Sequence, residues 1–203
     1  MGQFRSPTLD VIWAMPIRVV EPAEGLPPRR AFTVDEILRM QEAGVIQEDE
    51  NFELIEGEIV PMGPKYAAHE LIKSEVGVRL ARALPDHLRL GFESSIFLSP
   101  TTFVEPDICI YPRDLPSDQV KGEDLLLVIE VAASSLAFDR GRKASLYARY
   151  GVRELWVIDA ATRRTFAHQG PKETGWSEIV EKAPEEILRC DAIPDFSIRL
   201  AEI

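Results

Sequence analysis

The pattern of apolar and polar positions singles out one short segment in the second half of the chain. Residues 125–129 are all apolar, Glu130 follows them, and residues 131–133 are apolar again. A short apolar run bounded by polar turns predicts a strand that is covered on both faces of a sheet. An isolated carboxylate there is costly, because burial can shift a pKa by about 3 to 5 units. Glu130 is therefore expected to have a partner, to open onto a cleft, or to bind a cation.

Helical periodicity of apolar residues predicts three helices. The first lies in residues 31–44, where Thr33 and Glu36 have the spacing of a capping box. The second spans residues 67–84, and the third spans residues 139–150.

The strands are expected between these helices and after them. The predicted strand segments are 52–63, 91–100, 103–111, 125–133 and 153–160. Glu56-Gly57 suits a hairpin turn in the first of them, and a further turn is expected at residues 193–195. The last strand–helix–strand unit requires a parallel crossover. The prediction is one mixed α/β domain over residues 32–203, preceded by a proline-rich arm at residues 1–31.

Composition narrows the class of protein. The chain has 203 residues, of which 45% are hydrophobic and 28% charged, as in a globular protein with one sizeable core. No apolar run reaches the roughly 20 residues of a membrane span. Two cysteines, Cys109 and Cys190, are too few for a disulfide framework, and we expect a cytoplasmic protein. The net charge of −11 argues against a surface built for tight, non-specific phosphate binding.

Two further residues break the pattern of their elements. Asp107 lies in a strand whose alternation would place Glu105, Asp107 and Cys109 on one face. Lys143 lies on the apolar face of the third helix rather than on its solvent face. With Glu130, these residues suit a divalent cation, since Mg²⁺ prefers one or two carboxylates, waters and a substrate phosphate. A lysine beside the cation can position or deprotonate the attacking water.

Structural explanations exist for each of these residues. Asp139 and Lys143 can form an i, i+4 ion pair worth about a few tenths of a kcal/mol. Glu130 can be paired with an arginine, and Asp107 can cap a turn.

Two weaker candidates lie earlier in the chain. His69 opens the second helix and shares a face with Ile72, where a half-buried structural histidine is the alternative to a functional one. Glu53 flanks the predicted hairpin turn, where a solvated strand residue is the alternative.

The motifs around these residues follow one another in a specific order. They are ELIEGEIV at 53–60 with His69 beyond it, PD at 106–107, VIEV at 128–131, SS at 134–135, DRGRKASLY at 139–147 and YGVRELWVID at 150–159. This combination resembles the PD-(D/E)XK, or restriction-endonuclease-like, superfamily, and within it the Uma-type group of endonucleases. The resemblance covers residues 32–160 strongly and the C-terminal strands loosely. It implies a restriction-endonuclease-like α/β core, a mixed central β-sheet flanked by helices, with an added N-terminal helix and hairpin.

The resemblance also implies roles for single residues. Asp107 corresponds to the metal-binding aspartate and Glu130 to the (D/E) position. The lysine expected two residues after the glutamate is missing, because Ala132 stands there. The resemblance implies a lysine moved to the next helix, here Lys143. Three residues compete for the superfamily's first-helix glutamate, and the choice stays open: Glu53, Glu70 and Glu75.

We therefore expect a Mg²⁺-dependent endonuclease in which Mn²⁺ can replace Mg²⁺. Its expected substrate is nucleic acid, and of the nucleic acids we expect DNA. The expected catalytic residues are Asp107, Glu130, Lys143, Glu53 and His69, and the first two are the expected metal ligands. A basic rim beside the cleft is expected from Arg140, Arg142, Arg163 and Arg164. A homodimer or larger homo-oligomer is expected, as for many enzymes that cut two strands. The alternative is an inactive module that retains the fold and binds nucleic acid or protein.

Overall fold

The computed structural model describes residues 19–20, 29–47, 49–64 and 66–203. The predicted arm, residues 1–31, therefore lies for the most part outside the described residues. Its described part includes the short strands β1 (Val19–Val20) and β2 (Arg29–Arg30), which pair antiparallel.

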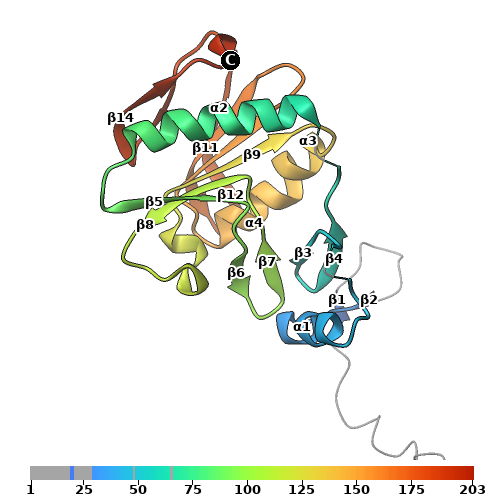
Figure 1. Ribbon diagram of the computed structural model, residues 1–203. Helices are drawn as coiled ribbons and strands as arrows, with labels where there is room; N and C mark the ends of the chain where they lie inside the picture. The colour runs from blue at the N-terminus through green and yellow to red at the C-terminus, as the bar shows by residue number, and fades with distance from the viewer. Residues whose placement is uncertain (1–18, 21–28, 48, 65) are drawn as a thin grey trace, which may run out of the picture.

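The centre of the molecule is a six-stranded mixed sheet with the strand order β12-β11-β10-β9-β8-β5 (Figure 1). Its strands are β5 (Leu88–Phe92), β8 (Ile108–Pro112), β9 (Leu127–Ala132), β10 (Glu154–Asp159), β11 (Thr165–Lys172) and β12 (Gly175–Lys182). Within this sheet β9 and β10 pair parallel, and the other neighbours pair antiparallel. The predicted parallel crossover is confirmed. So is the burial of the strand that carries Glu130, since all six residues of β9 are buried.

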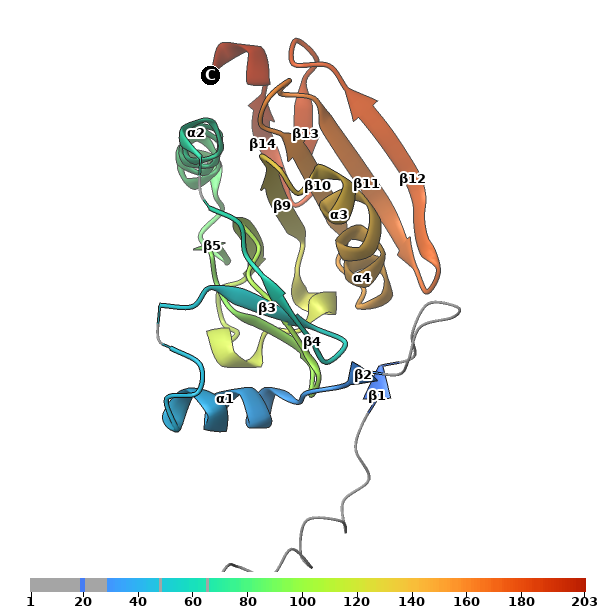
Figure 2. The same cartoon turned by 90° about the vertical axis from the view of Figure 1, so that its right-hand side faces the viewer.

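Helices cover both faces of this sheet and create two cores. Ile129 belongs to the core beneath α2 (Ala67–Ala83), whereas Val128 belongs to the core beneath α4 (Ala144–Arg149). Figure 2 shows α2 on one side of the sheet and α4 on the other. Because side chains alternate along a strand, Glu130 points to the α4 side, as Val128 does.

The helix predicted at residues 139–150 is present but is not regular. It consists of α3 (Leu136–Phe138), a π-helical turn η4 (Asp139–Lys143) and α4, and Gly151 closes it by donating its N–H to the carbonyl of Ala148. A π-helical turn contains an extra residue, so it re-aims the side chains that follow it, and such turns are frequent at functional sites. This turn places Lys143 at the start of α4, facing the sheet.

The remaining helices are short. Helix α1 (Val34–Glu42) starts with the predicted capping box between Thr33 and Glu36. The 3₁₀ helices are η2 (Ser117–Gln119), η3 (Gly122–Asp124) and η5 (Leu200–Glu202). Across the part of the chain that the structure describes, no helix has the length and apolar character needed to span a membrane.

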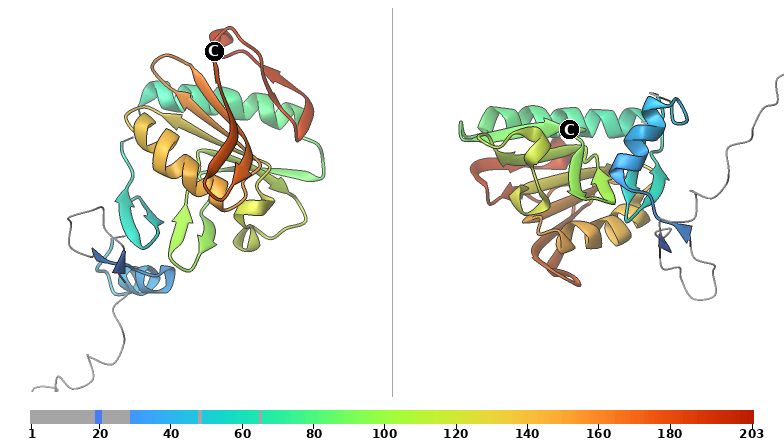
Figure 3. Two further views of the ribbon diagram at one scale, coloured as in Figure 1. Left: turned by 180° about the vertical axis from the view of Figure 1, so that it is seen from behind. Right: turned by 90° about the horizontal axis from the view of Figure 1, so that it is seen from below.

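A second, four-stranded sheet lies beside α1 at one end of the main sheet (Figure 3). Its order is β4-β3-β7-β6, and its strands are β3 (Phe52–Ile55), β4 (Glu58–Pro61), β6 (Ile96–Ser99) and β7 (Thr102–Val104). The predicted hairpin is confirmed: β3 and β4 pair around Glu56-Gly57, and φ is 53° at Glu56 and 84° at Gly57. Positive φ at both central residues is the requirement of a type I′ turn.

Two of the predicted strands are each divided between the two sheets. The segment 91–100 is interrupted after β5, where Glu93 has a φ of 45°, and resumes as β6. The segment 103–111 is interrupted between β7 and β8, with Pro106 in the gap. Glu105 and Asp107 lie in the link between the two sheets, so the continuous strand assumed in the predicted alternation through Glu105, Asp107 and Cys109 is not present. This corner puts Asp107 directly at the start of β8.

The turn predicted at residues 193–195 is also wrong. The C-terminal strands β13 (Leu188–Cys190) and β14 (Ile193–Ile198) pair with Cys190 opposite Ile193, so the turn lies at residues 191–192. Pro194 is tolerated inside β14 because this sheet has two strands, and each strand is an edge.

We expect Gly57→Ala to destabilise the hairpin that carries Glu53. Its φ is in the left-handed region, which costs an alanine about 1–2 kcal/mol, and the new Cβ would lie 2.6 Å from the Cβ of Ala31. Gly44→Ala is the matched control, since Gly44 has a φ of 68° and nothing within 4 Å of an added Cβ. Urea unfolding should show the larger loss for Gly57→Ala. Equal losses would contradict the close packing of the turn.

Candidate functional site

One cavity opens where β9 ends, between the β3–β4 hairpin and α3. All five residues predicted for the site line it: Glu53, His69, Asp107, Glu130 and Lys143. The lining also includes Glu105, Asp139, Ser134 and Ser135. The structure thus brings together side chains from two sheets and two helices, and most of the charged ones are acidic.

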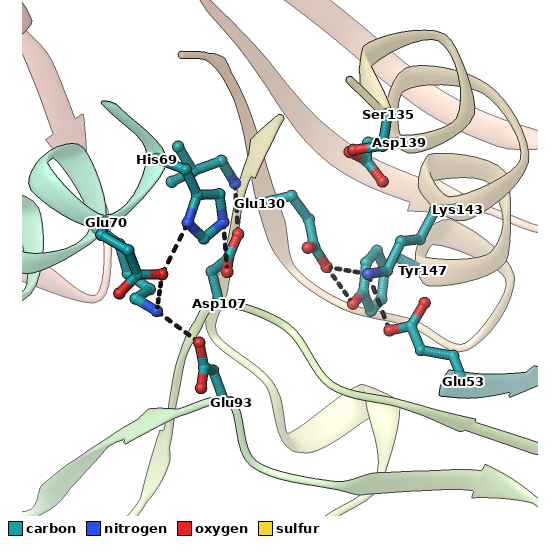
Figure 4. Close-up of polar contacts among 12 residues, drawn as sticks. Glu53, His69, Glu70, Glu93, Asp107, Glu130, Ser135, Asp139, Lys143 and Tyr147 are labelled. Carbon is teal, nitrogen blue, oxygen red and sulfur yellow. Dashed lines mark hydrogen bonds and ion pairs between the residues drawn. The ribbon is translucent and has the colours of Figure 1, made fainter. Parts of the chain in front are cut away.

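The ammonium of Lys143 lies between two carboxylates (Figure 4). Its Nζ is 2.9 Å from Oε1 of Glu53 and 2.9 Å from Oε1 of Glu130. The Oη of Tyr147 donates a hydrogen bond to the same Glu130 oxygen at 2.6 Å. The sequence predicts that a buried Glu130 needs a partner. In the structure its partners are Lys143 and Tyr147 rather than an arginine.

Asp139 does not follow the predicted i, i+4 pairing with Lys143. Its carboxylate accepts a hydrogen bond from the hydroxyl of Ser135, and the ion pairs of Lys143 within the described ranges go to Glu53 and Glu130. The π-helical turn that starts at Asp139 explains the difference, because it alters the spacing that an i, i+4 pair needs.

Burial shifts the pKa values of the ionisable side chains in this cluster. Lys143 is 5% exposed, as is Glu130. Burial raises the pKa of Glu130 well above its usual range, although the Lys143 ammonium acts in the opposite direction. Burial acts to lower the pKa of Lys143, but the carboxylates of Glu130, Glu53 and Asp139 outweigh it and raise that pKa. The carboxylates therefore favour the charged form of Lys143, whereas for Glu130 burial opposes the charged form and the Lys143 ammonium favours it.

Asp107 joins the ends of two strands to α2. Its Oδ2 accepts a hydrogen bond from the backbone N–H of Val131 at 2.7 Å, and its Oδ1 lies 2.9 Å from Nε2 of His69. Nδ1 of His69 lies 3.0 Å from Oε1 of Glu70. The hydrogen bond to Asp107 raises the pKa of His69. Asp107 thus bridges β8 and β9 instead of capping a turn, and His69 is held between two carboxylates.

The three candidates for the first-helix glutamate have different surroundings. Glu53 is buried, and its Oε1 also accepts the backbone N–H of Glu105 at 2.8 Å. Glu70 lies beside His69 and forms an ion pair with Lys73 at 2.8 Å. Glu75 is exposed on α2. Of the three, Glu53 is the one that lines the cavity.

Tyr147, which contacts Glu130, received no role from the sequence. The available indication was its spacing, four residues after Lys143 on the same helix. A tyrosine at such a position is ordinarily a core residue, and the hydroxyl contact becomes evident only once β9 is placed beneath α4.

The two expected metal ligands are carboxylates that line one cavity. Within residues 29–47, 49–64 and 66–203, no three His, Cys, Asp or Glu side chains are grouped so that they could hold a metal ion. Asp107 and Glu130 line the same cavity, and the described hydrogen bonds of Glu130 use Oε1, which leaves Oε2 available. Two carboxylates, completed by water and a substrate phosphate, are a donor set that suits Mg²⁺.

The predicted basic rim is not found at this cavity. None of its four arginines is among the described lining residues. Arg142 is 2.6 Å from a carboxylate oxygen of Glu58, and Arg164 is 2.6 Å from one of Glu181. On a surface with excess acid, these guanidinium groups are paired with nearby carboxylates. For Arg142, the pairing connects the π-helical turn η4 to the β3–β4 hairpin.

We expect Lys143→Met to lower the free energy of unfolding by about 3–5 kcal/mol, because it leaves two buried carboxylates without their shared cation. Arg142→Met is the matched control on the same helix. Its ion pair is partly exposed, and its loss should cost less than about 1 kcal/mol. Denaturant melts compare the two variants. Similar small losses would show that the buried pairs contribute little.

The comparisons with known proteins concern the family and the fold of the chain. The family model Uma2, described as "Putative restriction endonuclease", matches residues 34–201. The search of curated proteins found no match. A solved structure from Anabaena variabilis, described as "a putative nuclease belonging to DUF820", is similar with a TM-score of 0.68 and 16% identity, over 84% of this chain and 96% of that chain. That likeness shows a restriction-endonuclease-like fold, and by the family match the chain belongs to the Uma2 family.

Proposed function

We propose that this protein is a Mg²⁺-dependent endonuclease that hydrolyses phosphodiester bonds in nucleic acid, with DNA as the first expected substrate. The observation that carries the proposal is the position of Lys143, which reaches the Glu130 carboxylate from the following helix at 2.9 Å. The Uma2 family match supports a nuclease-like function with a nucleic-acid substrate.

The proposed roles follow from the surroundings of each side chain. Asp107 and Glu130 would hold the cation. When bound, Mg²⁺ would polarise the phosphate and lower the pKa of an attacking water. Lys143 is held by two carboxylates that favour its charged form, so it suits positioning of the water and stabilisation of negative charge better than removal of a proton. Glu53 fixes the Lys143 ammonium from the other side.

His69 is proposed to position Asp107. Its Nε2 contacts Asp107 and its Nδ1 contacts Glu70, so both ring nitrogens are engaged. This arrangement fixes the ring and, through it, one Asp107 oxygen.

The alternative function is a non-catalytic module that retains the fold. The net charge of −11 favours it, as does the pairing of Arg142 and Arg164 with surface carboxylates. Such a module need not bind Mg²⁺ or Mn²⁺, so metal titration discriminates between the two functions.

Assembly and location remain predictions. We propose a homodimer or a larger homo-oligomer in the cytoplasm. Light scattering at working concentration would refute the assembly if it gave the mass of a single chain.

We expect Glu130→Gln to leave the metal-free protein about as stable as the wild type, within about 1 kcal/mol. The amide oxygen can still accept from Lys143 and Tyr147, and Lys143 keeps Glu53 as its charged partner. Mn²⁺ should raise the melting temperature of the wild type by mass action but not that of the variant. A large loss of stability in the variant, together with no Mn²⁺ effect on the wild type, would contradict the proposed metal site.

Cleavage is the direct test of the function. With Mg²⁺, the wild type should nick or linearise plasmid DNA, and Glu130→Gln prepared in parallel should not. Single-stranded DNA and RNA extend the assay to other substrates. A protein that binds Mn²⁺ but cuts none of these would favour the module.

A further inference from the structure

We propose that Tyr147 determines which divalent cation the site accepts, by restricting Glu130 to a single available carboxylate oxygen. The inference rests on the proposed metal site and assigns a role to a residue that touches Glu130 from within the core.

The geometry is specific to one oxygen. Oε1 of Glu130 accepts from Tyr147 Oη at 2.6 Å and lies 2.9 Å from Lys143 Nζ. A carboxylate oxygen has two lone pairs, so these two donors occupy Oε1. In the described chain, no hydrogen bond goes to Oε2. Figure 4 shows Glu130 with Lys143 and Tyr147 on one side and Asp107 on the other.

The hydroxyl of Tyr147 is not needed for packing. The ring is 0% exposed, within the core cluster beneath α4. A phenylalanine would fill the same volume without a polar atom that has to be satisfied. The hydrogen bond of this hydroxyl in the described structure goes to Glu130, so the effect of the hydroxyl is on that carboxylate.

Asp107 is restricted in a similar way. Its Oδ2 is held by the N–H of Val131, and its Oδ1 is next to His69. Neither carboxylate therefore has two free oxygens with which to chelate one ion.

This restriction distinguishes small cations from large ones. Mg²⁺ requires near-octahedral geometry with ligands at about 2.0–2.1 Å, which one oxygen from each carboxylate can form together with water and phosphate oxygens. Ca²⁺ takes about 6–8 oxygens and often binds carboxylates through both oxygens. A Glu130 held by Tyr147 and Lys143 should therefore disfavour Ca²⁺, and loss of the tyrosine hydroxyl should relieve part of that restriction.

The test is a competition experiment in which Mg²⁺ or Ca²⁺ displaces Mn²⁺ from the full chain. The electron paramagnetic resonance signal of free Mn²⁺ measures the displacement. For the wild type, Ca²⁺ should compete no better than Mg²⁺. For Tyr147→Phe, the affinity for Ca²⁺ relative to Mg²⁺ should rise at least fivefold. Tyr150→Phe is the matched control, since it removes a hydroxyl at the end of the same helix, and it should leave the ratio unchanged. A tyrosine that served only stability would alter the melting temperature but not this ratio.

The outcomes separate the two proposals. Mn²⁺ binding by the wild type, with an unchanged Ca²⁺ to Mg²⁺ ratio in Tyr147→Phe, would overturn the selectivity role alone. A wild type that prefers Ca²⁺ would overturn that role even if the variant failed to fold. A wild type that binds none of the three cations would overturn the metal site and this inference with it.

Discussion

The sharing of one buried ammonium between two carboxylates is the interaction on which the site depends. Lys143 joins the hairpin that carries Glu53, the central strand that carries Glu130, and the helix to which it belongs. Burial alone would lower the pKa of Lys143 and raise that of Glu130. The carboxylates around Lys143 outweigh its burial and favour its charged form. The partly exposed ion pair of Arg142 with Glu58 also connects the helical segment to the hairpin, but such pairs near the surface contribute little.

The cavity is lined by more acidic than basic side chains, and its chemistry depends on this excess of negative charge. Lys143 supplies one positive charge to Glu53 and Glu130, and Asp107 lines the same cavity. Negative charge in excess of the available cation cannot be buried without cost. It is balanced either by a proton, which is why burial raises the pKa of Glu130, or by a cation that enters from the cavity. Under the proposed function, a small divalent cation would supply the missing charge.

Features that depend on residues close together in the sequence could be predicted from the sequence. The capping box of α1, the turn at Glu56-Gly57 and the need of Glu130 for a partner each follow from a few adjacent positions. Lys143 could be identified because a lysine on an apolar helical face is visible in the pattern. The hydroxyl of Tyr147 could not be given a role, because its partner lies on a strand that only the fold places beneath α4. The basic rim failed for the same reason: an arginine pairs with the carboxylates that the fold brings near it.

The acidic character of the chain bears directly on how a nucleic acid would reach this cavity. None of the four arginines predicted for a basic rim is among the described residues that line the cavity, and Arg142 and Arg164 are paired with carboxylates. A phosphate that approached the metal-free cavity would meet Asp107, Glu130 and Glu53, and repulsion would disfavour its entry. A bound divalent cation reverses the local sign and supplies a ligand position for a phosphate oxygen. Under the proposed function, substrate binding would therefore be coupled to metal binding itself, rather than to the general attraction between a basic protein and a polyanion.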